Sequence, residues 1–571
     1  MKNILCCLLT LCCYVQLTAQ PPARYHVLVH EIMANPPSLS ELLPNSKYIE
    51  LYNASPYPQD LYEWKISDGS SMAIISEHFV LQPDSFVIIC AMSGTQAISV
   101  FGKTIGVSRF PALRVNGDRL SLLSPENAVI HAVQYSRSWY KNELKQAGGW
   151  SLEMIDAKNP CGGADNWKAS TDRRGGTPGS YNSVAAGNPD QNAPQLLHAY
   201  ATDSLHVTLV FDESLDSTQA SQSKNFTFNE TSIIERATPM APFFNTVLLK
   251  LDKPLAKHTI YQVQAKNIYD CAGNTISNSA IVKTGLEEMP ESGDMVINEI
   301  LVNPKANGAK YVELYNRSQR IFNLKSLHIA GRNSSGELSD IKPLRTESAL
   351  IFPGDFVVVT DDAIAVKQQY LVKTPDALLE IPSMPSFPMA SGTVVVLNAQ
   401  GEATDELRYD ERWHFELITN TKGVALERID VNQPTQDQHN WHSAAANAGY
   451  GTPTYQNSQT GAHTQVTGEI KISPGIFSPD NDGHDDYLSI HYRFPEPGYV
   501  CNITVFDARG RIVRFAVRNG LCGTEGFFRW DGLDENKQPL SMGMYILLTE
   551  VYTLSGRTKQ FKQVVTLARR R

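Results

Sequence analysis

The sequence predicts an all-β protein built from several antiparallel β-sandwich or barrel domains in tandem. Its 571 residues suffice for about three to five domains of ordinary size. Apolar periodicity of the helical kind is scarce, whereas short runs such as Tyr48–Asn53 alternate in polarity, as strands do. Long stretches of the chain also occur twice. Together these three observations predict the fold class.

Composition narrows the classes of function. The net charge is −9, with 42% hydrophobic and 19% charged residues, which is typical of folded domains rather than of disorder. Phosphate contacts need clustered Lys and Arg, and the one basic run is the short end Ala568–Arg571. We therefore expect no nucleic-acid partner.

Residues 1–19 are predicted to be a secretory signal peptide. A positive second residue precedes the apolar run Ile4–Val15, which is too short to anchor in a bilayer, and Ala19 offers a small residue before the cut. Leu11 stands before Cys12, where a lipoprotein has a small residue, so no lipid anchor is expected. No later stretch approaches the roughly 18 uninterrupted apolar residues of a membrane span. We therefore expect no transmembrane anchor.

The mature chain would keep an odd number of cysteines, so at least one thiol lacks a partner within the chain. None stands in a CxxC motif, which gives zinc or thioredoxin-type chemistry no support. Cys501 and Cys522 fall in one predicted domain, where a bridge would contribute about 3 kcal/mol. Two buried thiols are an equally acceptable reading of the same pair. The remaining three cysteines are Cys90, Cys161 and Cys271.

One domain occurs twice, over residues 24–185 and 294–458. Thr177 and Thr452 are 275 positions apart, and the matching segments keep their order along the chain. The matched segments are "VLVHEIMANPP…YIELYNAS" with "MVINEILVNPK…YVELYNRS", "WSLEMIDAKNP" with "VALERIDVNQP", "DNWKAS" with "HNWHSA", and "GGTPGSYNS" with "GYGTPTYQNS".

Within the copies, several residues carry specific expectations. Asn116 and Gly117 stand between two apolar runs, which predicts a hairpin turn. Trp167 and Trp441 occupy equivalent places and are expected to be core or edge aromatics rather than carbohydrate-stacking residues. Both copies also share two carboxylates on neighbouring predicted strands. A general acid/base pair would need a suitable spacing and a cleft. We expect structural hydrogen bonding instead for Glu31, Glu50, Glu299 and Glu313.

The motifs of both copies resemble the lamin-tail domain as it occurs in secreted bacterial proteins. The resemblance rests on "EIMANPP…YIELYN", "LYEWKISDG", "FVLQPDSFVIIC" and "VNGDRLSLLSPENAVIHAVQY", and in the second copy on "INEILVNP", "YVELYN" and "FPGDFVVVTDD". That family is an Ig-like β-sandwich and a non-catalytic module. The resemblance implies tandem Ig-like antiparallel β-sandwich domains without naming a ligand.

Residues 193–286, after the polar linker Gly187–Gln195, resemble the bacterial Ig-like domain of the S-layer type. The resemblance rests on "VFDESLD" at Val210–Asp216 and "YDCAGN" at Tyr269–Asn274. Alternation in "HVTLVF" and "TVLLKL" independently predicts strands. Domains of this family act as spacers or adhesive units.

Residues 469–571, after the polar linker Asn457–Gly468, resemble the gliding-motility-associated C-terminal domain of Bacteroidetes. The matching motifs are Phe477–Asp486, Ile503–Gly510 and Trp530–Tyr545, with Ser541 where the family usually has Pro. This family is a type B sorting signal. The resemblance implies that the type IX secretion machinery is a partner and delivers the protein to the medium or the outer cell surface.

The acidic stretch "FSPDNDGHDDYL" allows two interpretations. A loose calcium site would use Asp480, Asp482 and Asp485, although a full EF-hand loop fails because Ser489 stands at its twelfth position. The favoured interpretation is a set of Asx-turns around Gly483, with core residues on either side. Calcium is the one cofactor that the sequence suggests.

No catalytic motif is present: HExxH, GxSxG, Walker and GxGxxG patterns are all missing from the sequence. His30 precedes Glu31 in the first copy, but Asn298 takes its place in the second, which does not suit a metal-ligand set. We therefore predict a non-enzymatic binding, adhesive or spacer protein whose ligand is unknown. The alternatives are an extracellular hydrolase acting on nucleic acids, phosphoesters or glycans, and a self-assembling component of the gliding or surface layer.

Overall fold

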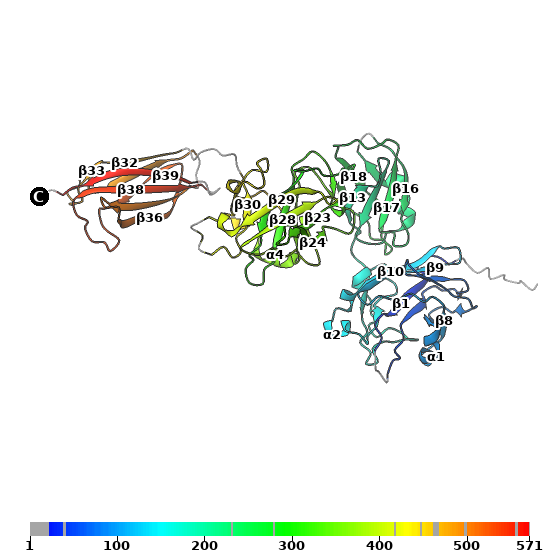
Figure 1. Cartoon of the computed structure of the whole chain (residues 1–571). Coiled ribbons are helices and arrows are strands. Elements are labelled where there is room, and N and C mark those ends of the chain that lie inside the picture. Colours follow the sequence, from blue (N-terminus) through cyan, green and yellow to red (C-terminus); the bar gives the residue numbers. More distant parts are fainter. Residues whose placement is uncertain are drawn as a thin grey trace, which may run out of the picture. The chain divides into compact units, whose positions relative to one another are not determined.

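The computed structural model describes residues 22–569, except 38–41, 230–231, 278–279, 416–417, 419, 446–447, 461–467, 496–498 and 554–557. The chain divides into two compact units, Met1–Leu286 and Glu287–Arg571 (Figure 1). The predicted signal peptide, most of the second linker and the last two arginines lie outside the described residues. Strands dominate the described part and pair into sheets that share apolar cores, so the all-β prediction is confirmed.

The first copy of the repeat is a β-sandwich, coloured blue to cyan in Figure 1. One continuous apolar core lies between its two sheets. The larger sheet is antiparallel apart from its last pair and has the order β12 (Trp167–Ala169), β11 (Leu152–Met154), β1 (Val27–Met33), β2 (Tyr48–Asn53), β7 (Phe86–Ala91), β8 (Thr104–Val107). The smaller sheet has the order β10 (Val129–Ser136), β9 (Gly117–Leu123), β4 (Lys65–Ser67), β5 (Met72–Ile74), and a short ribbon pairs β3 (Gln59–Asp60) with β6 (Val80–Leu81).

Strand β1 is buried at every position, because both faces of the larger sheet are covered. One face packs on the smaller sheet. The other face packs against α1 (Thr95–Ile98) and against residues 175–184, which we call the first cover segment. A bulge shifts the β1–β2 register between Val29 and Glu31 and leaves His30 without a cross-strand partner.

The second copy repeats this architecture, so the internal repeat is confirmed. Its bulge lies between Ile297 and Glu299 and isolates Asn298, and its cover segment is residues 450–459. Trp167 and Trp441 are both buried, as predicted. The larger sheet has the order β27 (Leu378–Glu380), β26 (Phe356–Thr360), β21 (Tyr311–Asn316), β20 (Met295–Leu301), β30 (Leu426–Arg428), β31 (Trp441–Ser443). The smaller sheet has the order β24 (Leu338–Pro343), β23 (His328–Arg332), β28 (Ser391–Leu397), β29 (Ala403–Asp410), with a ribbon of β22 (Phe322–Asn323) and β25 (Leu350–Ile351) and the helix α4 (Ala363–Gln369).

A smaller sandwich with its own core completes the first unit. The predicted linker before it is anchored, because Asn188 donates its N–H to Asp156 and its side-chain amide to the Asp165 carbonyl. A disulfide between Cys161 and Cys271 joins this sandwich to the first copy. One sheet has the order β13 (Leu196–Ala201), β14 (His206–Phe211), β17 (Thr246–Leu251), β16 (Ile234–Pro239), and the other β15 (Phe226–Phe228), β18 (Tyr261–Ala265), β19 (Ile281–Thr284), with the helix α3 (Ser217–Ala220).

The C-terminal sandwich is built from longer strands that alternate between buried and exposed positions. Phe477 and Leu488 are both completely buried in its core, as the turn interpretation of the acidic stretch requires. One sheet has the order β32 (Glu469–Ser473), β34 (Leu488–Arg493), β37 (Glu525–Trp530). The other has the order β33 (Ile476–Phe477), β39 (Thr558–Leu567), β38 (Gly543–Tyr552), β35 (Tyr499–Asp507), β36 (Ile512–Cys522).

The hairpin predicted at Asn116 and Gly117 is wrong. A turn is present there, but residues 111–116 form no strand, and β9 pairs with the following strand β10 instead. The Asp118 carboxylate accepts the Arg114 N–H (3.0 Å), which holds the chain in an irregular loop before the strand. The remaining short helix is α2 (Glu143–Gln146), and the described residues contain no helix long and apolar enough to cross a membrane.

Candidate functional site

Each copy aligns three glutamates across neighbouring strands of its larger sheet. The central glutamate, on β1 or β20, pairs in register with a glutamate on each adjacent strand. All six side chains are completely buried. We call each set a carboxylate ladder. The two ladders are Glu50–Glu31–Glu153 and Glu313–Glu299–Glu427.

The first cover segment supplies hydrogen-bond donors to its ladder. The Thr177 N–H donates to Glu31 Oε1 (2.9 Å), and the Thr177 hydroxyl donates to Glu153 Oε1 (2.9 Å). The Gly179 N–H donates to Glu50 Oε2. Each rung is therefore bonded to a segment that lies more than a hundred residues from β1 and β2 in the sequence.

The second cover segment makes the equivalent contacts. The Thr452 N–H donates to Glu299 Oε1 (3.0 Å), and its hydroxyl lies 2.8 Å from Glu427 Oε1. The Thr454 N–H donates to Glu313 Oε2 (2.6 Å). Because both copies repeat the arrangement, it belongs to the domain rather than to one chance packing.

Burial favours the protonated form of the ladder carboxyls on β1, β2, β20 and β21. Burial first, and the neighbouring ladder carboxylate second, raise the pKa of Glu31 to about 7 and that of Glu299 to about 8. The same two causes raise the pKa of Glu50 and of Glu313 well above the ordinary range. A general acid or base must reach its substrate's proton, and these groups lie under the cover segments. The hydrogen-bonding role predicted for the shared carboxylates is therefore confirmed.

The third glutamate of each ladder and the threonine of each cover segment were not predicted from the sequence. Glu153 and Glu427 stand in the matched segments "WSLEMIDAKNP" and "VALERIDVNQP". Thr177 and Thr452 stand in the matched "GTP". The internal repeat could have indicated these residues, because polar residues that recur at equivalent buried positions have a shared structural use.

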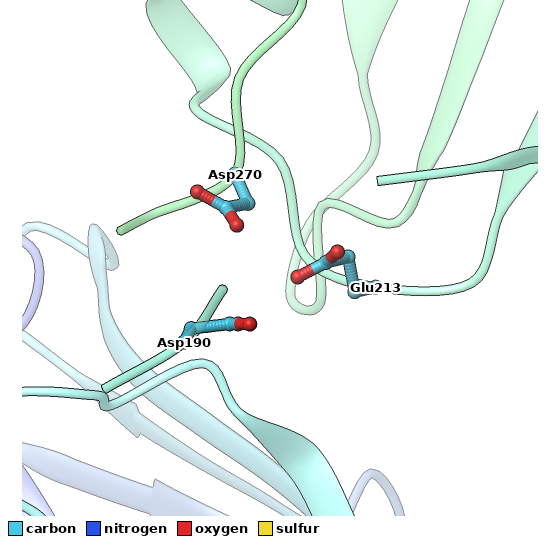
Figure 2. Close-up of side chains that lie close together, drawn as sticks. All are labelled: Asp190, Glu213 and Asp270. Atoms are coloured by element: carbon cyan, nitrogen blue, oxygen red, sulfur yellow. The ribbon is translucent and has the colours of Figure 1, made fainter. Parts of the chain in front are cut away.

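A second acidic cluster, the acidic trio, joins three separate segments of the first unit. Asp190 comes from the linker, Glu213 follows β14 and Asp270 follows β18, and their carboxylates face one another in Figure 2. One oxygen of each lies within 4.8 Å of the others. The N–H of Gly273 (2.6 Å) and the side-chain amide of Asn274 (2.7 Å) donate to Asp270 and fix its orientation.

The chemistry of the trio is that of oxygen ligands for a hard cation. Calcium takes carboxylate oxygens in flexible geometry, and three carboxylates from three segments fit that donor set. Burial first, and then the charges of Asp270 and Asp190, raise the pKa of Glu213 to about 8. Glu213 and Asp270 stand in the two motifs of the S-layer-type resemblance, but their meeting with Asp190 depends on the tertiary fold.

Replacing Glu213 by glutamine is expected to flatten the pH dependence of the first unit's stability. A carboxyl group whose pKa rises on folding contributes stability that is present below pH 4.5 and is lost as the pH rises through about 8. Denaturant unfolding of the full chain between these limits, followed by hydrogen exchange in residues 193–286, checks this. Glu235→Gln, at an exposed glutamate of β16 that does not act on Glu213, is the matched control and should leave the wild-type slope unchanged.

The acidic stretch of the C-terminal sandwich gathers a different set of carboxylates from the predicted one. Asp480, Asp482 and Asp486 come within 4.8 Å of one another, whereas the predicted Asp485 is not a member of the group. Asp486 accepts the Gly483 N–H (2.9 Å), and Gly483 has φ 89°. These contacts match the Asx-turn interpretation. Calcium binding at this loop stays a prediction, with the third carboxylate corrected.

The cysteines pair differently from the expectation. Cys501 and Cys522 are buried free thiols, so the bridge considered for them is not formed in this structure. Cys522 stands opposite Tyr499 rather than Cys501, and such diagonal neighbours lie about 7–8 Å apart, beyond the usual Cα separation in disulfides. A hydrogen bond with the Cys522 thiol, followed by burial, raises the pKa of Cys501. The bridge joins Cys161 to Cys271 instead.

The fold defines a protein of tandem β-sandwich domains, and one family model matches part of the first of them. Residues 20–137 match the family model described as Lamin Tail Domain. The match covers two rungs of the first ladder and ends before the third rung and the cover segment. The comparison with curated proteins found no match.

Several solved structures match the chain with low identity and low TM-scores. The N-terminal part of the bacterial S-layer protein SbsC is 14% identical, with 38% of this chain and 44% of that chain covered and a TM-score of 0.16. A tetra-tandem repeat in the extending region of a large adhesion protein is 10% identical, with 93% and 97% covered and a TM-score of 0.15. A DUF4876 family protein from Bacteroides thetaiotaomicron is 11% identical, with 36% and 84% covered and a TM-score of 0.17. TM-scores this low carry no argument about fold or function.

Proposed function

We propose that the chain is an exported protein of the outer cell surface or the medium, with a non-catalytic binding, adhesive or spacing role. The observation that carries the proposal is the closure of both carboxylate ladders by their own cover segments. The carboxylates that the copies share are buried and bond the cover segments to the sheets. The succession of β-sandwiches and the lamin-tail match over residues 20–137 also support a modular role without chemistry.

The proposed route is Sec export followed by type IX secretion, with the type IX machinery as partner. The support is the N-terminal pattern of residues 1–19 and the three motifs of residues 469–571. Residues of these motifs meet in one aromatic core, where the rings of Phe477 and Trp530 are 5.3 Å apart and those of Trp530 and Tyr545 are 5.5 Å apart. Ile503 and Val505 of the second motif lie in the same core, so each of the three motifs supplies part of it.

Deleting residues 469–571 is expected to keep most of the protein inside the cell envelope. The reason is that the sorting signal recognised by the secretion pore would be lost, while the signal peptide for Sec export remains. Fractionation of cells and medium, followed by immunoblotting, measures this. A deletion of residues 294–458 is the matched control and should still reach the exterior. Normal export of the chain without residues 469–571 would rule out the proposed route.

The alternatives lead to different observations on the purified full chain. A hydrolase would turn over nucleic acids, phosphoesters or glycans. A self-assembling layer component would form large particles in light scattering at increasing concentration. A protein that stays monomeric and inactive but binds to cells or matrix polymers would have the proposed role.

A further inference from the structure

The two ladders differ at the bulged position of the central strand. In the second copy, the Asn298 side-chain amide donates to Glu313 Oε1 (2.8 Å) and to Asn457 Oδ1 (2.8 Å). Asn457 belongs to the second cover segment, and its own amide donates back to the Asn298 carbonyl (2.9 Å). One asparagine therefore bonds the strand, the ladder and the cover segment together.

The first copy has His30 at this position, and the same bonds are missing. Asn182 of the first cover segment donates its amide to the His30 carbonyl (3.0 Å), as Asn457 does to Asn298. However, Asn182 Oδ1 and Glu50 Oε1 have no hydrogen-bond partner among the described residues, and neither does His30 Nδ1. Three buried polar atoms are thus left unsatisfied where the second copy satisfies the equivalent oxygens.

The imidazole lies beneath the first cover segment. His30 is 5% exposed, and its Nδ1 lies 3.5 Å from Glu50 Oε1. Its ring packs against Phe86 at 5.4 Å, and Phe86 packs against Tyr181 of the cover segment at 5.1 Å. Water can solvate the imidazole only if the cover segment moves away.

We propose that His30 makes the first cover segment a latch that acid releases, whereas Asn298 keeps the second cover segment closed over the same pH range. In the closed state, burial holds the pKa of His30 down at about 3, compared with 6.5 for a free imidazole. Opening lets the imidazole take a proton from solvent. A base whose pKa falls on closure contributes stability that is present above pH 6.5 and is lost as the pH falls towards 3.

As the pH falls, the other titratable groups around His30 either stabilise the closed cover segment or keep the same protonation state. The ladder carboxyls with raised pKa stabilise both closed segments as the pH falls from about 7 to 4.5. Tyrosines in this environment do not titrate in acid. The His30→Asn variant isolates the histidine, because a comparison of the two copies also includes His414 and His442, whose pKa values burial lowers in the second copy. The groups around His30 are Glu31, Tyr48, Glu50, Tyr52, Glu153, Tyr181 and, beside Glu31, Arg174.

Hydrogen exchange of the full chain at several pH values, corrected for intrinsic rates, tests the proposal. The readout is the protection of residues 175–184 relative to residues 450–459. The pKa change from 6.5 to about 3 predicts a relative loss of about tenfold at about pH 5.5 and about thirtyfold at about pH 5. His30→Asn should abolish this loss, and Asn298→His should create it in the second copy.

Three results would contradict the proposal. A relative protection in the wild-type chain that does not change with pH would overturn the latch, even if neither variant folds. So would an acid loss that persists in His30→Asn, because its cause would then lie outside the imidazole. A His30 resonance that titrates near 6.5 in the folded chain would also contradict the proposal.

Discussion

Replacing Glu31 by alanine is expected to detach the first cover segment and to lower the first copy's free energy of unfolding by about 3–5 kcal/mol. Glu31 Oε1 accepts hydrogen bonds from the hydroxyls of Tyr48 (2.7 Å) and Ser151 (2.6 Å) and from the Thr177 N–H (2.9 Å). Alanine would leave three buried donors without an acceptor, at a cost of about 1–3 kcal/mol each before relaxation. Denaturant-dependent hydrogen exchange measures this, with the second copy as an internal reference.

Glu31→Gln is the matched control for this variant. The amide oxygen can accept the same three donors, so the loss of stability should be much smaller than with alanine. Because the pKa of Glu31 is raised to about 7, the contribution of Glu31 to stability is full below pH 4.5 and is lost as the pH rises through about 7. That change amounts to roughly 3 kcal/mol, and it should vanish in the glutamine variant. Equal losses in both variants would show that the ladder bonds do not hold the segment.

The fold was largely predictable because its signals are local. Alternation in "YIELYN" and "YVELYN" marks two strands that the structure places at the centre of equivalent sheets. The repeat then transfers each assignment from one copy to the other. The hairpin at Asn116–Gly117 failed because the turn pair was judged without its partner strand. Asp118 binds back to Arg114 and keeps the preceding residues out of any sheet.

The sites were less predictable because their members meet across long stretches of chain. Thr177 reaches Glu31 across 146 residues, and the trio brings Asp190 to Glu213 and Asp270. No periodicity records such a meeting. The disulfide shows the same limit, because connectivity among five cysteines cannot be deduced from spacing alone. The chosen pair, Cys501 and Cys522, shares a domain, but the strand register sets the two residues diagonally.

The difference between His30 and Asn298 had one meaning in the sequence and has another in the structure. At the level of sequence it argued against a metal site, because ligand sets should recur in both copies. In the structure the same difference removes bonds that the second copy makes. A buried, unsatisfied histidine costs stability, so its presence in an architecture that the second copy builds without it points to a use for the instability. The acid-released latch is such a use, and it concerns one copy only.

Removing the disulfide is expected to have the other large effect, confined to the first unit. Cys161 and Cys271 are 110 residues apart, and closing a loop of that length stabilises the folded state by about 4–5 kcal/mol in the chain-entropy account. The double variant Cys161→Ser, Cys271→Ser should therefore melt residues 22–286 at a lower temperature. Calorimetry of the full chain, with exchange in residues 287–569 as reference, measures this. Added reductant should have no further effect on the variant.

The loss of stability should first affect the junction between the two sandwiches of that unit. After reduction, the junction still has the Arg24 guanidinium, which donates to the Leu215 carbonyl (3.0 Å) and lies 4.3 Å from the Phe244 ring. Asp270 precedes Cys271, so the acidic trio should loosen as well. The pH dependence that Glu213 imposes should then shrink in the double variant. An unchanged pH profile with a lowered melting temperature would show that the trio is held by its own loop and not by the bridge.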